Sequence, residues 1–372
     1  MHTLFYSLIR LSIGTETSFS RNPSAEEWGE LYKTTRKQCL LGVCFSGVRR
    51  HMEATKAEEK DARIPSKLYM QWLASAVQIQ RQNELMNRRC EELQAALSSY
   101  GLRNAILKCQ AVAALYHMEG MQGDTLLSEL RQSGDVDVYV DCGRERAIEF
   151  ASSIGQQTID WDYKHLHLHL FPDAEVEMHY RLEVLLNLTK NRRLQRWFAR
   201  EETQRQIFCQ QGALVAPSVE FNLFYILLHI YRHFLYEGVG LRQLMDYFFV
   251  LKAVNSETDT RWSKDAIKSF GIKRFARGVM WIMQHVFGLE KEFLLYESDE
   301  KEGRYILNQV MKGGNFGHHD ERLKSNNMHS NKLNAVKKIL KHNLHLLAHY
   351  PMEVFWAPVW IVYHWCWKRW VR

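Results

Sequence analysis

Residues 134–141 read GDVDVYVD, and this segment constrains the fold of the 372-residue chain more than any other. Side chains alternate between the two faces of a strand, so Asp135 and Asp137 point to one face and the valines to the other. Asp is a poor strand residue, and two neighbouring carboxylates repel each other unless a cation lies between them. The segment therefore predicts a half-buried strand with a cation-binding acidic edge, the alternative being a strand end whose acidic pair is merely solvated.

A third carboxylate follows in a predicted hairpin. Residues 165–171 (HLHLHLF) and 172–181 (PDAEVEMHYR) both alternate, and Pro-Asp between them indicates a turn. If the second strand lies beside the acidic strand, Glu177 completes a three-carboxylate cluster, whereas Glu175 is expected to be solvated. Mg²⁺ prefers such oxygen ligands, and the third carboxylate can take the proton of an attacking hydroxyl. This is the chemistry of phosphoryl or nucleotidyl transfer.

Histidines suggest metal binding at two places, and neither pattern is strong. His165, His167 and His169 share one face of the first hairpin strand. Alternate histidines on one strand rarely converge as a complete zinc site, so we expect a polar face that lines a phosphate-rich cleft. His229 and His233 are four apart in an apolar helical run, but no HExxH arrangement contains them, which disfavours a metalloprotease.

The remaining patterns divide the chain into three predicted regions: helical residues 1–101, a mixed core at 102–185, and helical residues 186–372. Residues 105–116 are predicted to run from a short strand through a tight turn into a helix. Ser218 is a predicted N-cap for a helix at 219–236, and a further helix is expected at 241–254. The predicted class is α+β, with a small mixed β-sheet between large N- and C-terminal helical regions.

Composition limits the function classes. The net charge of +7 fits an anionic substrate, and no long basic run or DNA-binding motif predicts contact with duplex DNA. Seven cysteines form no secreted disulfide framework, and the first residues lack a cleavable leader pattern, so we expect a cytoplasmic protein. No run reaches the roughly 18 apolar residues that a membrane-spanning helix needs.

The C-terminal residues 350–372 are rich in Trp and carry basic residues at their end. Aromatic residues with basic flanks are typical of an interfacial membrane anchor. Pro351 and Pro358 are expected to break the run, however, and Trp-rich helices often pack on their own domain. We therefore expect packing on the protein body, with weak peripheral membrane contact as the alternative.

Four segments in one order, LKCQAVAALY, RQSGDVDVYVD, EVEMHYR and HIYRHFLYEGVGLRQLMDY, resemble the uncharacterised nucleotidyltransferase family of bacteria. That family belongs to the superfamily with the DNA polymerase β type of nucleotidyltransferase domain, and the resemblance extends to GGNFG at residues 313–317. It implies Mg²⁺- or Mn²⁺-dependent transfer of a nucleoside monophosphate from an NTP, with ATP as the expected donor. A small molecule, a sugar phosphate, a protein or a nucleic acid remains open as the acceptor.

The resemblance also implies a set of site residues. Asp135, Asp137 and Glu177 match the catalytic, metal-binding carboxylates. Positions implied to contact the nucleotide are Lys108, Cys109, Gln110, Arg131, Ser133, Gly134 and Arg242. Lys108 begins what is usually a Lys-Gly turn, where backbone N–H groups approach the triphosphate. Arg242 and Asp246 match family positions as well, although their spacing of four is also that of a surface ion pair.

Two departures from the family pattern bear on activity. Cys109 stands where the family usually has glycine, and a side chain costs energy there if the backbone needs a positive φ. The stretch between Tyr116 and Arg131 is also longer than usual. These features leave a second reading open: a catalytically impaired nucleotide-binding or regulatory protein on a nucleotidyltransferase scaffold.

Overall fold

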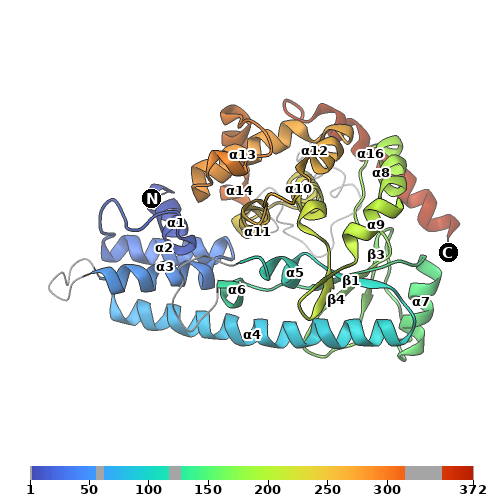
Figure 1. The fold of residues 1–372 in the computed structure, drawn as a ribbon, viewed down its shortest axis with the longest axis horizontal. Coiled ribbons are helices and arrows are strands. Elements are labelled where there is room, and N and C mark those ends of the chain that lie inside the picture. Colours follow the sequence, from blue (N-terminus) through green and yellow to red (C-terminus); the bar gives the residue numbers. More distant parts are fainter. Residues whose placement is uncertain (1, 56–62, 117–126, 315–345, 372) are drawn as a thin grey trace, which may run out of the picture.

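A computed structural model describes residues 2–55, 63–116, 127–314 and 346–371, which form helices around a small four-stranded sheet, with a separate two-stranded sheet of β5 and β6 (Figure 1). Its elements in chain order are α1 (His2–Ile13), α2 (Ala25–Lys37), α3 (Leu41–Ala54), α4 (Ser66–Ser99), β1 (Asn104–Leu107), α5 (Cys109–Ala113), α6 (Leu127–Leu130), β2 (Val136–Val140), α7 (Arg144–Ser153), β3 (His165–Leu168), β4 (Val176–His179), α8 (Leu188–Phe198), α9 (Glu201–Ile207), β5 (Cys209–Gln211), β6 (Leu214–Ala216), α10 (Val219–Tyr236), α11 (Leu241–Lys252), α12 (Thr260–Ser269), α13 (Lys273–Phe287), η2 (Lys291–Phe293), α14 (Glu300–Gly313) and α16 (Pro351–Trp370). The predicted α+β class is confirmed.

The main sheet has four strands in the order β1-β2-β4-β3. β1 and β2 are antiparallel, β2 and β4 are parallel, and β4 and β3 are antiparallel, so the sheet is mixed as predicted. The predicted hairpin is confirmed as β3 and β4, with His165 opposite His179. The chain crosses from β2 to β4 through α7 and β3, which brings two acidic segments together.

One face of the sheet is apolar and packs on α4 and α7. Val136, Val138 and Val140 are buried in a cluster with Leu93 of α4 and Phe150 of α7. Burying an apolar side chain of this size contributes about 1.5–3 kcal/mol, so this layer fixes which face of β2 points inward. The other face of β2 and β4 carries Asp137 and Glu177.

Helices α10 and α11 lie on the side of α5 and the strands opposite α4 (Figure 1). Ser218 caps α10 as predicted, since its hydroxyl accepts a hydrogen bond from the Phe221 N–H at 3.2 Å. The bounds predicted for α10 are confirmed, while α11 ends at Lys252, two residues earlier than predicted. α11 also contacts α5, so the C-terminal helices close over the turn that follows β1.

The N-terminal helices are joined to the C-terminal ones rather than separate from them. α1 packs on α3 and α13, and Thr15 donates a hydrogen bond to the Phe287 carbonyl at 2.7 Å. One apolar cluster runs from α1 to α14. The helical assignment of the N-terminal region is confirmed, and the division of the chain into three regions stays a prediction.

Helix α16 is continuous, so the expectation that Pro351 and Pro358 break it was wrong. Pro351 occupies the first turn, where its missing N–H is not needed, and Pro358 removes a single helical hydrogen bond. Trp360 and Trp367 pack on Tyr163, with ring centroids 5.2 and 4.8 Å away, which confirms docking on the protein body.

Two further expectations concern the GGNFG segment and membrane-spanning helices. Of the GGNFG segment, Gly313 and Gly314 close α14, and residues 315–317 lie outside the described residues. Across residues 2–55, 63–116, 127–314 and 346–371, no helix combines the length and the hydrophobicity that crossing a bilayer requires.

Candidate active site

The turn from β1 into α5 is the first part of the site. Lys108 has φ 47° and ψ −131°, and Cys109 is the first residue of α5. Only Lys108 and Cys39 among the described non-glycine residues have a positive φ. The strained backbone conformation expected at Cys109 is therefore found at Lys108, because the chain turns sharply before the helix begins. A non-glycine residue held in such a conformation costs of order 1–3 kcal/mol.

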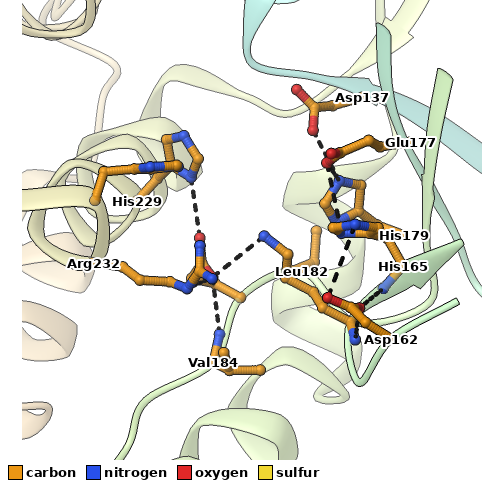
Figure 2. Close-up of polar contacts among 12 residues, drawn as sticks. Asp137, Asp162, His165, Glu177, His179, Leu182, Val184, His229 and Arg232 are labelled. Atoms are coloured by element: carbon orange, nitrogen blue, oxygen red, sulfur yellow. Dashed lines mark hydrogen bonds and ion pairs between the residues drawn. The ribbon is translucent and has the colours of Figure 1, made fainter. Parts of the chain in front are cut away.

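Asp137 and Glu177 are direct neighbours across the parallel pair β2 and β4. The next polar residue on β4, His179, is fully buried, and its Nε2 lies 2.8 Å from the Asp137 carboxylate (Figure 2). Val138 and Met178 between them point into the opposite core. The predicted approach of Glu177 to the acidic strand is thus confirmed, while its chemical role stays a prediction.

A lysine from the strained turn neutralises Asp137. Lys108 Nζ lies 2.7 Å from Asp137 Oδ1, and both side chains are almost fully buried. Burial alone would raise the pKa of Asp137, but Lys108 and His179 hold it well below its usual range. Burial would also raise the pKa of Glu177, but the contact with His179 at 3.3 Å lowers it to about 2. Both carboxylates are therefore ionised at neutral pH.

Asp135 is the carboxylate whose charge is least compensated. It lies directly before β2 and is exposed within the mouth of a cavity. The cavity walls keep part of the bulk water away, and the charges of Asp137 and Glu177 add to this effect, so the pKa of Asp135 is raised. A divalent cation near Asp135 would relieve this repulsion, because such an ion compensates neighbouring carboxylate charges.

The cavity has a volume of about 410 Å³, within the range of small-molecule sites. Its lining includes the three carboxylates, Lys108, Cys109, Arg131, Gly134 and Arg242, all of which the resemblance implied. Gln110 and Ser133 do not line it. Gln110 donates to Asn87 at 2.5 Å, and Ser133 lies half-buried in the loop before β2. Glu175 is exposed, as expected.

A buried ion pair holds the loop before β2. Arg131 donates to both oxygens of Asp246 at 2.6 and 2.7 Å, and Tyr116 donates to the same carboxylate at 2.7 Å. The interpretation of Arg242 and Asp246 as a surface ion pair was wrong, since both are buried and Asp246 pairs with Arg131. Sequence patterns could not predict the pairing of Arg131 with Asp246, because the two residues are 115 positions apart.

Arg242 differs from the other cations of the cavity. Its Nη1 donates to the Gln132 carbonyl at 2.8 Å, and its buried Nε has no hydrogen-bond partner in the part of the chain that is described. Its side chain also lies beside Gly134, where an added Cβ would be 3.4 Å from Nη1. A buried guanidinium with an unused donor is suited to an anion that enters the cavity.

Glu183, which sequence reasoning missed, organises the wall opposite the three carboxylates. It is fully buried between His229 at 3.0 Å, Arg232 at 3.4 Å and Lys164 at 3.7 Å. Burial would raise the pKa of Glu183, but Lys164 and Arg232 hold it well below its usual value. His233 contacts Glu237 at 2.6 Å, so the two α10 histidines face separate carboxylates rather than a shared ion.

An acidic cluster on a small mixed sheet, beside a strand-to-helix turn and under a helical layer, is typical of nucleotidyltransferases. The family described as uncharacterised nucleotidyltransferases matches residues 24–288. The chain belongs to this family, which confirms the resemblance seen in its motifs. No curated protein and no solved structure matches the chain.

Proposed function

We propose that the protein transfers a nucleoside monophosphate from an NTP, with ATP as the expected donor, to a hydroxyl-bearing acceptor. The observation that carries the proposal is the parallel register that sets Asp137 beside Glu177 at the cavity containing Asp135. Carboxylates that line a cavity with cationic walls match a polyphosphate bound through Mg²⁺ or Mn²⁺.

In this proposal Asp135 and Asp137 hold the divalent cation, which would neutralise charge on the phosphates when bound. The acceptor oxygen attacks the α-phosphorus, the bond between that phosphorus and the bridging oxygen breaks, and pyrophosphate leaves. Glu177 is ionised at neutral pH, so it can accept the hydroxyl proton as the new P–O bond forms. No group beyond the acceptor and the donor is consumed.

Arg242 is the proposed phosphate contact on the helical side. Its Nε is buried without a partner among the described residues, whereas three nitrogens of Arg131 already donate to Asp246 and to the Gln132 carbonyl. We therefore assign Arg131 a positioning role in the loop before β2. Lys108 is bound to Asp137 at 2.7 Å, and a cation on that carboxylate would free its ammonium group for a phosphate oxygen.

Transfer is tested with α-labelled NTPs and a cell extract as the source of acceptors, followed by identification of the labelled product. Asp137→Asn keeps the shape of the side chain and removes its charge, and Glu175→Gln is the matched control from the exposed start of the same acidic face. We expect the control to react like the wild type and Asp137→Asn to lose at least about 10²- to 10³-fold in rate. Equal pyrophosphate release by Asp137→Asn and wild type would refute the proposal.

A nucleotide-binding regulator is the second candidate, and one contact favours it. Asp137 already has two partners, Lys108 and His179, within 2.8 Å, so the cation site is closed by an internal ammonium group. Calorimetry with Mg²⁺-ATP separates the two functions. Binding without pyrophosphate release, also in Cys109→Gly, supports the regulator, whereas turnover restored by that glycine supports the enzyme.

A further inference from the structure

We propose a second metal site, formed by His165, Glu177 and His179, that takes a nitrogen-preferring divalent ion of the Zn²⁺ or Co²⁺ class. It is distinct from the aspartate pair in its ligands and does not depend on the proposed transfer. The three residues come from both strands of the hairpin, since His165 lies on β3 and the other two on β4. Each offers one ligand atom, and these atoms lie within 4.8 Å of one another.

The distances from Glu177 to the two histidine nitrogens match the edges of a tetrahedral site. Glu177 Oε2 lies 3.5 Å from His165 Nδ1 and 3.3 Å from His179 Nε2. With metal–nitrogen and metal–oxygen bonds of about 2.0–2.2 Å, the edge of a tetrahedron is roughly 3.3–3.6 Å. Both measured distances are close to such an edge. Both distances are longer than a good hydrogen bond. An ion bound here would take the place of the proton that His179 Nε2 shares with Asp137 at 2.8 Å.

An unpartnered nitrogen points to a missing ligand. His165 Nδ1 is buried and has no hydrogen-bond partner among the described residues, although Glu177 Oε2 is only 3.5 Å away. A bound ion would satisfy it. The other ring nitrogen, Nε2, lies 3.9 Å from the Asp162 carboxylate (Figure 2), and a carboxylate behind a histidine ligand is a common outer partner in metal sites.

The chemistry of the set decides which ion it prefers. Two neutral imidazoles and one carboxylate are typical ligands of Zn²⁺ and Co²⁺, whereas Mg²⁺ prefers oxygen ligands alone. His165 and Glu177 line the cavity, so the fourth position of a tetrahedral ion can face the cavity interior. Three protein ligands with one open position are typical of a site that binds water or a substrate atom. Because Glu177 belongs to both sites, an ion held here competes for the proposed proton acceptor.

The test measures binding of the metal alone by the full chain, without nucleotide. Chelator-treated protein is titrated with Co²⁺, whose visible absorption is strong only in tetrahedral sites, and Zn²⁺ is then added as a competitor. His165→Gln removes a ligand, and His169→Gln is the matched control because His169 is exposed on the same hairpin. Asp135→Asn disables the aspartate pair and leaves the three proposed ligands in place.

We expect wild type, His169→Gln and Asp135→Asn each to bind one Co²⁺ with tetrahedral absorption that Zn²⁺ displaces. His165→Gln should lose at least the roughly 10- to 100-fold in affinity that removal of an outer partner costs. Equal affinity of His165→Gln and wild type would overturn the proposal, as would loss of binding in Asp135→Asn alone. If circular dichroism shows that His165→Gln does not fold, Glu177→Gln replaces it, because this variant also removes one proposed ligand. Intact Co²⁺ binding without nucleotide transfer would leave this site standing and remove the proposed function.

Discussion

Arg131 and Asp246 are 115 residues apart in the chain and form a buried, two-pronged ion pair that joins the loop before β2 to α11. The contact ties the acidic strand to the helical layer that closes the cavity. Tyr116, which lies three residues after α5, donates to the same carboxylate. One aspartate on α11 therefore anchors both segments that flank the residues 117–126.

Breaking this pair is predicted to destabilise the fold strongly. Asp246→Asn leaves the buried Arg131 guanidinium without a counter-charge, and loss of one partner of a buried pair costs about 3–5 kcal/mol. Chemical denaturation measures the loss. Arg205→Ala breaks the exposed Arg205–Glu201 pair and should change stability by less than about 0.5 kcal/mol. A loss in Asp246→Asn no larger than in this control would contradict the prediction.

Stability is predicted to fall on the acid side because of the wall around Glu183. Burial holds the pKa of His229 well below 6.5, so the unfolded chain takes up a proton first as the pH drops below about that value. The lowered pKa of Glu183 acts in the same direction. Its contribution to the free energy of unfolding is fully present above the ordinary pKa of 4.5 and is lost as the pH falls through the pKa in the folded state.

The free energy of unfolding measured from pH 8 to pH 4 checks this. Each group contributes a slope of up to about 1.4 kcal/mol per pH unit in its window. His229→Gln should flatten the curve between pH 6.5 and 5, and His169→Gln, which changes an exposed histidine, should keep the wild-type slope. An unchanged slope in His229→Gln would show that this histidine does not supply it.

Nucleotide affinity is predicted to depend on Arg242. A hydrogen bond to a charged group contributes about 1.5–3 kcal/mol, so Arg242→Met should weaken Mg²⁺-ATP binding roughly 10- to 100-fold. Titration calorimetry measures the change. Lys252→Met removes a cation from the exposed end of the same helix and serves as the control. Equal affinity in the two variants would exclude Arg242 as a phosphate contact.

The positive φ of Lys108 predicts a difference between two variants that lose the same ion pair. Lys108→Gly and Lys108→Ala both leave Asp137 without the ammonium group, but only glycine adopts φ 47° without strain. The glycine variant should therefore be more stable than the alanine variant by about 1 kcal/mol. Thermal unfolding of the pair decides this, and an alanine variant at least as stable as the glycine one would contradict the backbone conformation.

The outward face of α16 is expected to contact anionic membranes weakly. Trp365 and Trp370 are 60% and 95% exposed, and Lys368 and Arg369 lie beside them. Flotation with vesicles of anionic lipid should show partial binding of the full chain and less binding of the double variant Trp365→Ser, Trp370→Ser. Met70→Ser removes an exposed apolar side chain elsewhere and should bind like the wild type. Equal flotation of all three proteins would remove the membrane contact.

Local patterns were enough to predict the strands and the face of each strand that carries its acidic residues. The valines of β2 alternate with Asp137, and the same period in β4 places Glu177 and His179 on one face. Strand alternation is a property of neighbouring residues, so it can be deduced without knowledge of distant contacts. The cap at Ser218 is local in the same way.

The features that the sequence did not reveal depend on contacts between distant segments. The pairing of Asp246 with Arg131 rather than Arg242 requires α11 to lie over the loop before β2. The approach of His165 to His179 requires the hairpin to fold in one register, which a histidine pattern on a single strand does not show. The strained backbone conformation of the turn lies at Lys108, and steric contacts rather than a sequence pattern determine this position.

The alignment of β4 with β2 makes the chemistry sensitive to the length of the intervening chain. A shift of β4 by one residue would turn Glu177 into the apolar layer and present Val176 or Met178 to the cavity instead. Insertions or deletions between α7 and β4 are therefore tolerated only where a loop absorbs them before the hairpin. A relative that differs in length within the hairpin itself would have to rebuild its acidic cluster from other positions.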